Sequence, residues 1–198
     1  MRKLFIGLVL GFSLLAAAET AIVERETKTS FAPHWEVSGT TLACTGVAVR
    51  QVYGFDVYGI GHYGDPADAP KPEATAEEKL AHWIKSSKTK AMIIKFVFHA
   101  DKQNMRNFAG KSLEDAGYTG EKQEKFLEAF AQDYSSGSEA KLIATGSTLR
   151  VEIDGQDKGS WDDADLVRAL WECWLGNKSV LKKREGLVTL PEVKPAGK

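Results

Sequence analysis

Arg50 is the residue of this sequence whose surroundings point most directly to chemistry. It lies in the stretch GVAVRQVYGFDVYGIGHYG, residues 46–64, which contains four aromatic rings of Phe and Tyr and a glycine at each expected bend. A guanidinium group stays charged in proteins, and burying it without a partner is costly. Arg50 is therefore either a charge that faces solvent or a buried partner for an anion, and the residues alone favour neither interpretation.

The alternation of side chains along the expected strand 40–51 places Arg50 on one of its two faces. Successive side chains of a strand point to opposite sides, so every second residue shares a face. On that rule Arg50 shares its face with small and apolar residues, namely Leu42, Cys44, Gly46 and Ala48. If this face is inside the protein, Arg50 must meet a carboxylate, a phosphate, a carbonyl or the anionic group of a ligand.

The remaining polar residues give weaker signals. The four histidines (His34, His62, His82 and His99) do not have the spacing of a metal site, and we predict neither a metal nor a cofactor. His62, between Gly61 and Tyr63, is the one candidate for an axial haem ligand, although a structural role is favoured. Cys44 and Cys173 could form a disulfide or could be two separate buried thiols, and both possibilities stay open.

The two ends of the chain predict export and set the domain limits. Arg2 and Lys3 precede an apolar run and three alanines, which is the pattern of a cleaved signal peptide over residues 1–18. We expect a loose arm over 19–33, one domain over 34–187 and a flexible tail over 188–198. The protein would then be periplasmic or secreted, without stable insertion in the membrane after cleavage. The net charge of −1 and the absence of a basic patch argue against a nucleic-acid partner.

The elements that must position Arg50 form runs of strands followed by runs of helices. We expect strands over 34–38, 40–51, 53–63, 91–100, 141–145 and 148–153. Helices are expected over 77–85, 101–115, 120–134 and 162–176, with a short basic helix over 179–184. The segment DGQDKG, residues 154–159, is expected to be a turn. This order lacks a strand–helix–strand alternation, so it predicts an α+β fold with an antiparallel sheet.

Three stretches together resemble the chalcone isomerase family, and in particular its bacterial chalcone isomerase-like branch. They are TGVAVRQVYGFDVYGIGHYG, KAMIIKFVFHADKQNMRNF and LRVEIDGQDKGSWDDADLVRALWECWLGNKSVLKKREGL, and the resemblance extends from Trp35 to Leu187. It implies an open-faced β-sandwich, in which helices cover one side of a large antiparallel sheet and a ligand cleft lies between them. The plant enzymes of this family cyclise chalcones, whereas relatives without that activity bind fatty acids.

The resemblance carries over to this chain one residue at a time. Arg50 stands where the enzymes have the arginine that orients the reacting phenolate. Tyr58 stands at the position of a strand threonine, Met105 at that of a tyrosine and Ser112 near that of an asparagine. An arginine–tyrosine clamp for a carboxylate would therefore need another tyrosine here, and the candidates are Tyr53, Tyr58 and Tyr63.

The sequence thus predicts an exported, non-catalytic protein that binds a small amphipathic or aromatic anion, such as a fatty acid, beside Arg50. The residues predicted to line the cleft with Arg50 are Tyr53, Tyr58, Ile94, Phe96, Met105, Phe108 and Leu170. One alternative is an intramolecular lyase, or isomerase, that acts on a phenolic, chalcone-like substrate with Arg50 as its catalytic residue. A second alternative is a haem-binding or partner-binding module that uses His62 or the Trp171/Trp174 surface.

Overall fold

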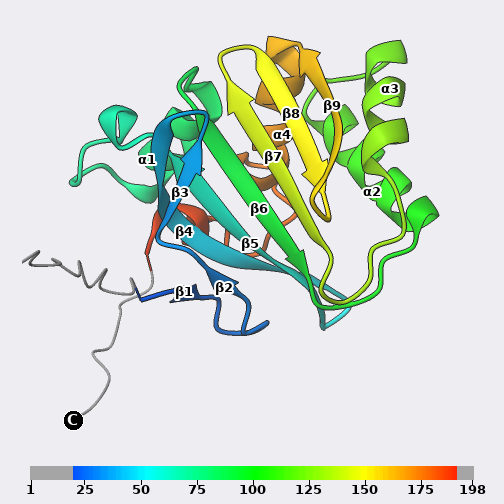
Figure 1. The fold of residues 1–198 in the computed structure, drawn as a ribbon, viewed down its shortest axis with the longest axis horizontal. Helices are drawn as coiled ribbons and strands as arrows, with labels where there is room; N and C mark the ends of the chain where they lie inside the picture. Colours follow the sequence, from blue (N-terminus) through cyan, green and yellow to red (C-terminus); the bar gives the residue numbers. More distant parts are fainter. Residues whose placement is uncertain (1–19, 191–198) are drawn as a thin grey trace, which may run out of the picture.

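Seven antiparallel strands form a curled sheet in which their spatial order repeats their order in the chain (Figure 1). The computed structural model describes residues 20–190. The strands of this sheet are β3 (His34–Val37), β4 (Thr40–Val52), β5 (Phe55–Gly64), β6 (Lys90–Phe96), β7 (Glu139–Thr145), β8 (Thr148–Ile153) and β9 (Gln156–Asp162). Each strand pairs only with its sequence neighbours in the sheet, so every connection within it is antiparallel.

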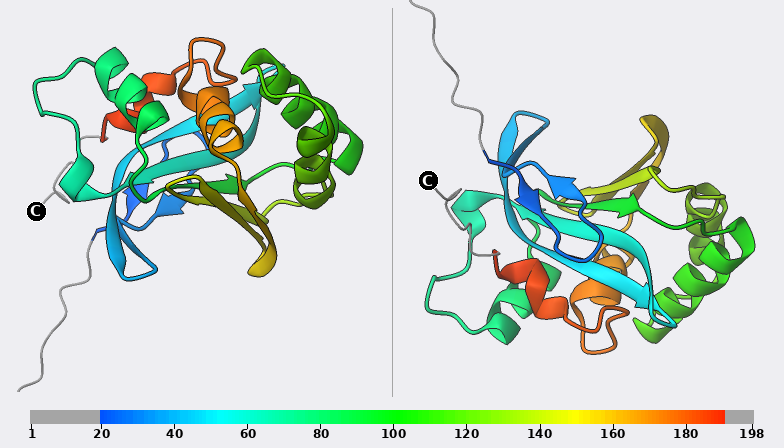
Figure 2. Two further views of the ribbon diagram at one scale, coloured as in Figure 1. Left: turned by 90° about the horizontal axis from the view of Figure 1, so that it is seen from above. Right: turned by 90° about the horizontal axis from the view of Figure 1, so that it is seen from below.

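Helices cover one face of the sheet (Figure 2). In the described part of the chain the helices are α1 (Ala76–Lys85), α2 (Lys102–Asp115), α3 (Glu121–Phe130) and α4 (Ala164–Leu175), with short 3₁₀ turns η1 (Pro66–Asp68) and η2 (Arg184–Val188). Thr75 and Asp163 accept hydrogen bonds from the first backbone N–H groups of α1 and α4, which explains where these helices begin. The predicted α+β class, with helices over a large antiparallel sheet, is confirmed.

The segment expected to be a loose arm instead covers part of the other face of the sheet. Within it, residues 20–33 contain two short paired strands, β1 (Ile22–Val23) and β2 (Ser30–Phe31). The ring of Phe31 is 1% exposed and packs directly on Gly61 of β5, where a Cβ atom would lie 2.7 Å from the ring. The predicted signal peptide, and the tail beyond residue 190, lie outside the described residues.

A bulge in β4 changes which side chains share a face. The pairing of β4 with β5 shifts between Cys44 and Gly46, so Thr45 is an extra residue there. Leu42 and Cys44 therefore belong to the core on the β1–β2 side, while Ala48 belongs to the larger core under the helices. The prediction that Leu42 and Cys44 share a face with Ala48 and Arg50 is wrong for this reason.

The same arrangement keeps the two cysteines apart. Cys44 lies in the core on the β1–β2 side of the sheet, and Cys173 of α4 lies in the core under the helices. Both are buried free thiols. Because the sheet separates them, the disulfide that the sequence left open does not form in this fold.

The C-terminal part of the chain departs from the sequence prediction in two places. The expected turn over 154–159 is reduced to Asp154 and Gly155, which both have positive φ and join β8 to β9 as a tight hairpin. The edge strand β9 was not predicted, because its sequence is polar and contains a glycine. A 3₁₀ turn at Arg184–Val188 replaces the expected helix over 179–184.

Gly46 is expected to be essential for stability, because η2 packs directly against it. A Cβ atom at this position would overlap the backbone carbonyl of Gly186. We expect Gly46→Ala to lower the free energy of unfolding by about 1–3 kcal/mol, as overpacking does elsewhere. Urea denaturation followed by circular dichroism measures this change.

Gly110 in the middle of α2 is the matched control for this substitution. A Cβ atom there would make only a 3.4 Å contact with Leu127, so Gly110→Ala should be neutral or stabilising by up to about 1 kcal/mol. Equal effects of the two substitutions would contradict the packing described for η2.

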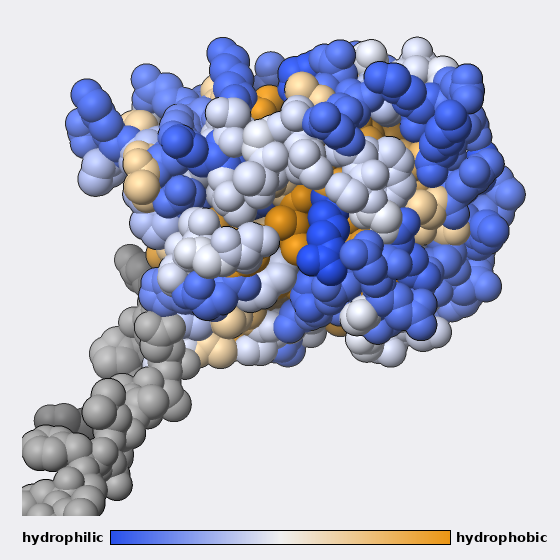
Figure 3. Space-filling view, turned by 45° about the horizontal axis from the view of Figure 1, so that its top comes forward, coloured by the Kyte–Doolittle hydropathy of each residue, from blue (hydrophilic) through white to orange (hydrophobic). Residues whose placement is uncertain are grey.

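The surface of the described domain is mostly hydrophilic in the view of Figure 3, and hydrophobic side chains show there mainly in a depression near the centre. Among residues 20–190, no helix combines the length and apolar character needed to cross a bilayer.

Candidate functional site

A pocket of about 520 Å³ lies between the far end of the β4–β5 hairpin and the start of α2. The hairpin contributes one wall, and the segment from the end of β6 into α2 contributes the other. The lining residues of the first wall are Arg50, Val52, Tyr53, Phe55, Val57 and Tyr58, and those of the second are Phe98, His99, Ala100, Asp101, Asn104, Met105 and Phe108. The walls are thus mainly apolar, with few polar groups, as is usual for small-molecule sites.

Arg50 is half-buried at this pocket and lies neither in bulk solvent nor in an ion pair. Its Nη1 donates a hydrogen bond to the backbone carbonyl of Val180, and its guanidinium carbon lies 5.2 Å from the ring centre of Phe108. No carboxylate of residues 20–190 forms a salt bridge with it. Because a guanidinium carries five N–H donors, Arg50 retains donors for an anion in the pocket.

Tyr58 is the cross-strand neighbour of Arg50 and is 2% exposed. Its hydroxyl oxygen accepts a hydrogen bond of 3.0 Å from the indole N–H of Trp174. Burial raises the pKa of Tyr58 to about 12, although Trp174 and the charge of Arg50 act in the opposite direction. Tyr58 is therefore protonated at neutral pH, and Trp174 holds its hydroxyl in place.

The other two tyrosines considered for a clamp lie elsewhere. Tyr53 is at the turn of the hairpin with a positive φ and is 97% exposed. Tyr63 is buried in the core on the β1–β2 side, where its hydroxyl donates to the carbonyl oxygen of Ala32. Tyr58 is thus the only one of the three that lies beside Arg50 with a buried hydroxyl.

The pocket contains five of the eight residues that were predicted to line the cleft. Arg50, Tyr53, Tyr58, Met105 and Phe108 all contribute to its walls. Ile94, Phe96 and Leu170 do not: they are almost fully buried in the core beneath it. Their position has a physical cause, since α4 packs directly on the sheet and Phe96 is enclosed between the rings of Tyr58 and Tyr134.

Of the pocket residues that were not predicted from the sequence, Phe55 and Phe98 have the largest apolar side chains. Phe55 begins β5 and Phe98 lies in the loop after β6, and their rings stack with centroids 5.9 Å apart. The available signal for Phe55 was its place next to the expected bend at Gly54. Phe98 gave no such signal, because it lies within the strand that was expected over 91–100.

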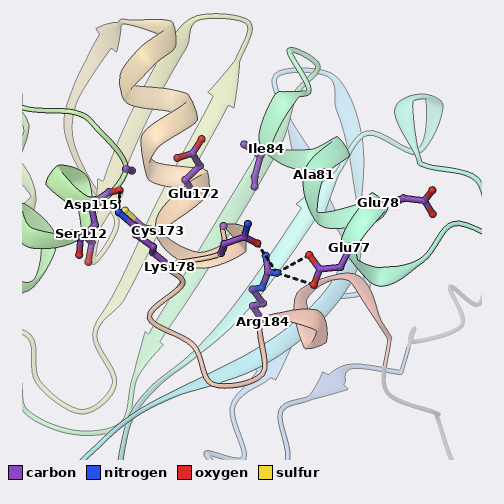
Figure 4. Close-up of a pocket in the computed structure, with 13 residues that line it drawn as sticks. Glu77, Glu78, Ala81, Ile84, Ser112, Asp115, Glu172, Cys173, Lys178 and Arg184 are labelled. Carbon is purple, nitrogen blue, oxygen red and sulfur yellow. Dashed lines mark hydrogen bonds and ion pairs between the residues drawn. The ribbon is translucent and has the colours of Figure 1, made fainter.

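A second pocket, of about 580 Å³, lies between α1, the end of α2 and the end of α4 (Figure 4). Arg184 is prominent in it, but its Nη2 already donates to both carboxylate oxygens of Glu77, at 2.8 and 2.7 Å. Lys178 is the other cation in this pocket. Three further carboxylates line its walls, namely Glu78, Asp115 and Glu172. This pocket is therefore net acidic and unsuited to an anion. Ser112, expected near the asparagine position of the enzymes, lies here and not beside Arg50.

His62 is completely buried, and both of its ring nitrogens are in hydrogen bonds. Nε2 accepts from the indole N–H of Trp171 at 3.0 Å, so the proton lies on Nδ1 and is donated to Thr45 Oγ1 at 2.6 Å. The hydroxyl of Thr45 donates in turn to the carbonyl oxygen of Leu187. Burial, with a contribution from the charge of Lys90, lowers the pKa of His62 to about 3.

This network argues against the haem-binding and partner-binding alternatives. An iron ligand needs a free nitrogen lone pair and access, and His62 offers neither without disruption of the network. Trp171 is fully buried and Trp174 is nearly so, so they form no surface for a partner. His62 instead joins α4, β5, β4 and the segment that contains η2.

Lys90 is a second buried polar residue that the sequence did not single out. Its Nζ donates to the carbonyl oxygens of Trp83 and Ile84 near the end of α1 and lies 4.7 Å from the ring centre of Trp171. Burial lowers the pKa of Lys90 to about 7. Its position at the carboxyl end of α1 indicates a capping role.

Comparisons with known proteins agree with this fold. The sequence profile described as chalcone isomerase-like matches residues 25–185. The crystal structure of an Arabidopsis thaliana fatty-acid binding protein superposes with a TM-score of 0.70 at 20% sequence identity, and the match covers 85% of this chain and 96% of that chain. No curated protein sequence matches.

Proposed function

The chain belongs to the chalcone isomerase-like family, and from that premise we propose that it is a binding protein for a small amphipathic anion, such as a fatty acid or an aromatic acid. One observation carries the proposal: Arg50 is a half-buried cation without a carboxylate partner among the described residues, and it faces a mainly apolar pocket. The similarity of the fold to that of a fatty-acid binding protein supports the same ligand class.

The polar groups at the inner end of the pocket suit a carboxylate. Arg50 supplies a charged donor and Tyr58 supplies a neutral one, and hydrogen bonds between ionised partners are the strongest of their kind. Asp101 also lines the pocket, but its carboxylate accepts from the backbone N–H of Asn104 and caps α2. The apolar walls would then receive the hydrocarbon part of the ligand.

Binding is favoured over ring closure because two polar positions of the enzymes are changed. Met105 lines the pocket without a hydrogen-bond donor, and Ser112 lies in the other pocket. The alternative lyase, with Arg50 stabilising a phenolate, would have to work through Arg50 and Tyr58 alone. Incubation with naringenin chalcone and chiral analysis of the flavanone would detect such activity, because spontaneous closure gives a racemic product.

We also propose that the protein works outside the cytoplasm. This part of the proposal rests on the pattern of residues 1–18, which lie outside the described structure. N-terminal sequencing of the protein from a bacterial host, after separation of periplasm and cytoplasm, would test both the export and the cleavage site.

Titration of the purified chain with laurate and with 4-coumarate, followed by isothermal calorimetry, tests the binding function. We expect one molecule of at least one of these anions to bind per chain. Native mass spectrometry should in addition detect a bound acid after mild purification. A chain that binds neither anion and carries no acid would contradict the proposed function.

Tyr58→Phe is expected to weaken laurate binding about tenfold, because a hydrogen bond to a charged group contributes about 1.5 kcal/mol or more. The matched control is Tyr118→Phe, since the hydroxyl of Tyr118 also makes a hydrogen bond, to Asp163, but lies outside this pocket. Calorimetry of both variants measures the difference. Equal affinities for the two variants would exclude a role for the Tyr58 hydroxyl in the site.

A further inference from the structure

The mouth of the Arg50 pocket has an unusual concentration of exposed aromatic rings. Tyr53 is 97% exposed, Phe55 is 63% exposed and Phe98 is 51% exposed. They are three of the five large hydrophobic side chains exposed in residues 20–190, and all three line this pocket. We call these three residues the aromatic tip. Exposed apolar clusters of this kind usually mark an interaction surface.

The pocket has both buried and exposed walls. Tyr58 and Met105 are buried at the inner end, where Arg50 supplies the positive charge, and Phe98, Phe55 and Tyr53 are increasingly exposed toward the mouth. An amphipathic anion would therefore bind with its charged group inward. Its hydrocarbon tail would leave the pocket along Phe55 and Phe98, whose stacked rings form the apolar edge of the mouth.

We infer that the aromatic tip docks on the surface of a lipid bilayer, so that an acyl chain passes between the membrane and the Arg50 pocket without crossing water. This inference rests on the proposed function for the direction in which the ligand lies. The side-chain chemistry fits a bilayer surface, because tyrosine and phenylalanine rings partition to the interface between head groups and acyl chains.

The size of the aromatic tip favours a bilayer over a second copy of the chain. At about 200 Å² for each ring, the exposed fractions amount to roughly 400 Å² of apolar surface. A stable dimer needs about 800 Å² on each partner. The tip alone is thus too small for a lasting protein interface, whereas shallow insertion in a membrane has no such requirement.

Cations beside the same strand add a suitable charge for anionic head groups. Arg25, Lys182 and Lys183 line a cleft along Val49 and Gln51 of β4, the strand that leads to the tip. Glu24 and Glu26 also line this cleft and offset two of these charges, so one positive charge remains in excess. Glu24 is buried and accepts hydrogen bonds from Thr27.

Flotation with phospholipid vesicles tests the inference. The protein is the chain from Glu19 onward, since the apolar run Leu4 to Leu15 would bind vesicles by itself and residues 20–190 contain both cores of the fold. Vesicles of phosphatidylcholine, with and without phosphatidylglycerol, are used without any fatty acid. We expect the wild-type chain to float with the vesicles, more strongly when phosphatidylglycerol is present.

Substitutions at the tip should abolish this flotation. The combined variant Tyr53→Ser, Phe55→Ser and Phe98→Ser is expected to lose at least about tenfold in partitioning, and Phe55→Ser alone should lose part of that. Leu190→Ser is the matched control, because Leu190 is 53% exposed but follows η2, which packs on Gly46 in the middle of β4. Circular dichroism shows whether each variant is folded.

The outcomes separate this inference from the proposed function. If the wild-type chain stays in solution, or if the folded combined variant floats equally well, docking by the tip is refuted. A dimer in light scattering that the combined variant loses, without flotation of the wild type, would assign the tip to a second copy instead. Titration with laurate and 4-coumarate without vesicles reports on the pocket alone, so a chain that floats but binds neither anion and carries no acid overturns the proposed function and supports the docking.

Discussion

Arg50→Ala is expected to weaken laurate binding about 50-fold, measured by isothermal calorimetry on folded protein. The substitution removes the charged donor from the inner end of the pocket, and hydrogen bonds to charged groups contribute about 1.5–3 kcal/mol each. Since 1.4 kcal/mol corresponds to a tenfold change in affinity, a loss of about 2.4 kcal/mol gives this factor. Tyr58 and the apolar walls remain, so residual binding is expected.

Arg150→Ala is the matched control for this prediction. Arg150 is also an arginine on a strand, but its Nε donates to Asp157 on the neighbouring strand and it does not line the pocket. We expect the laurate affinity of the Arg150→Ala variant to equal that of the wild type. Arg50→Lys should lie between the two, because an ammonium group keeps the charge but loses the planar pair of donors. Wild-type affinity in Arg50→Ala would refute the anion site.

Mild acid is expected to destabilise the protein strongly through His62. The pKa of His62 is about 3 in the folded state, against an ordinary value of 6.5. Between these values the unfolded chain binds a proton that the folded chain does not, so folding becomes less favourable as the pH falls. The contribution of His62 to the free energy of unfolding has its full value above about pH 6.5. It decreases by roughly 1.4 kcal/mol for each pH unit below that value, down to about pH 3.

Urea denaturation near pH 4.5 and near pH 7 measures this effect, which amounts to a loss of about 2–3 kcal/mol from His62. His62→Gln should be less stable than the wild type at pH 7, but its free energy of unfolding should differ less between pH 4.5 and pH 7. His99→Gln, at an exposed histidine, should show the wild-type difference. Lys90 contributes little to this difference, because its pKa of about 7 in the folded state lies at the upper end of the range and below it Lys90 is protonated in both states. An unchanged pH dependence in His62→Gln would contradict the buried neutral state.

The sequence predicted most of the sheet but assigned β4 to its faces incorrectly. Alternation identified the strand, and apolar runs identified its neighbours, because these patterns follow from the geometry of a strand. The insertion of Thr45 as a bulge reverses the faces of Leu42 and Cys44 relative to Ala48. A bulge depends on pairing with a distant strand, so local alternation could not reveal it. The polar edge strand β9 escaped prediction because it has no buried face pattern.

The candidate site was predicted in part for the same kind of reason. Arg50 was identified because it is a cation among small and apolar residues of a strand, and Tyr58 because the family resemblance places it at a position of the enzyme site. The structure makes them cross-strand neighbours. Ile94, Phe96 and Leu170 were expected in the cleft, yet the packing of α4 on the sheet encloses them. The stacking of Phe55 on Phe98 joins residues 43 positions apart, and only the three-dimensional arrangement of the hairpin and the start of α2 brings them together.

A crystal structure of the protein with laurate brominated at its terminal carbon tests the central claim most directly. We expect the carboxylate within hydrogen-bond distance of Arg50 and of the Tyr58 hydroxyl, and the anomalous signal of the bromine near Phe55 and Phe98. A carboxylate bound at Arg184 or elsewhere, with Arg50 still bonded only to the carbonyl of Val180, would contradict the account.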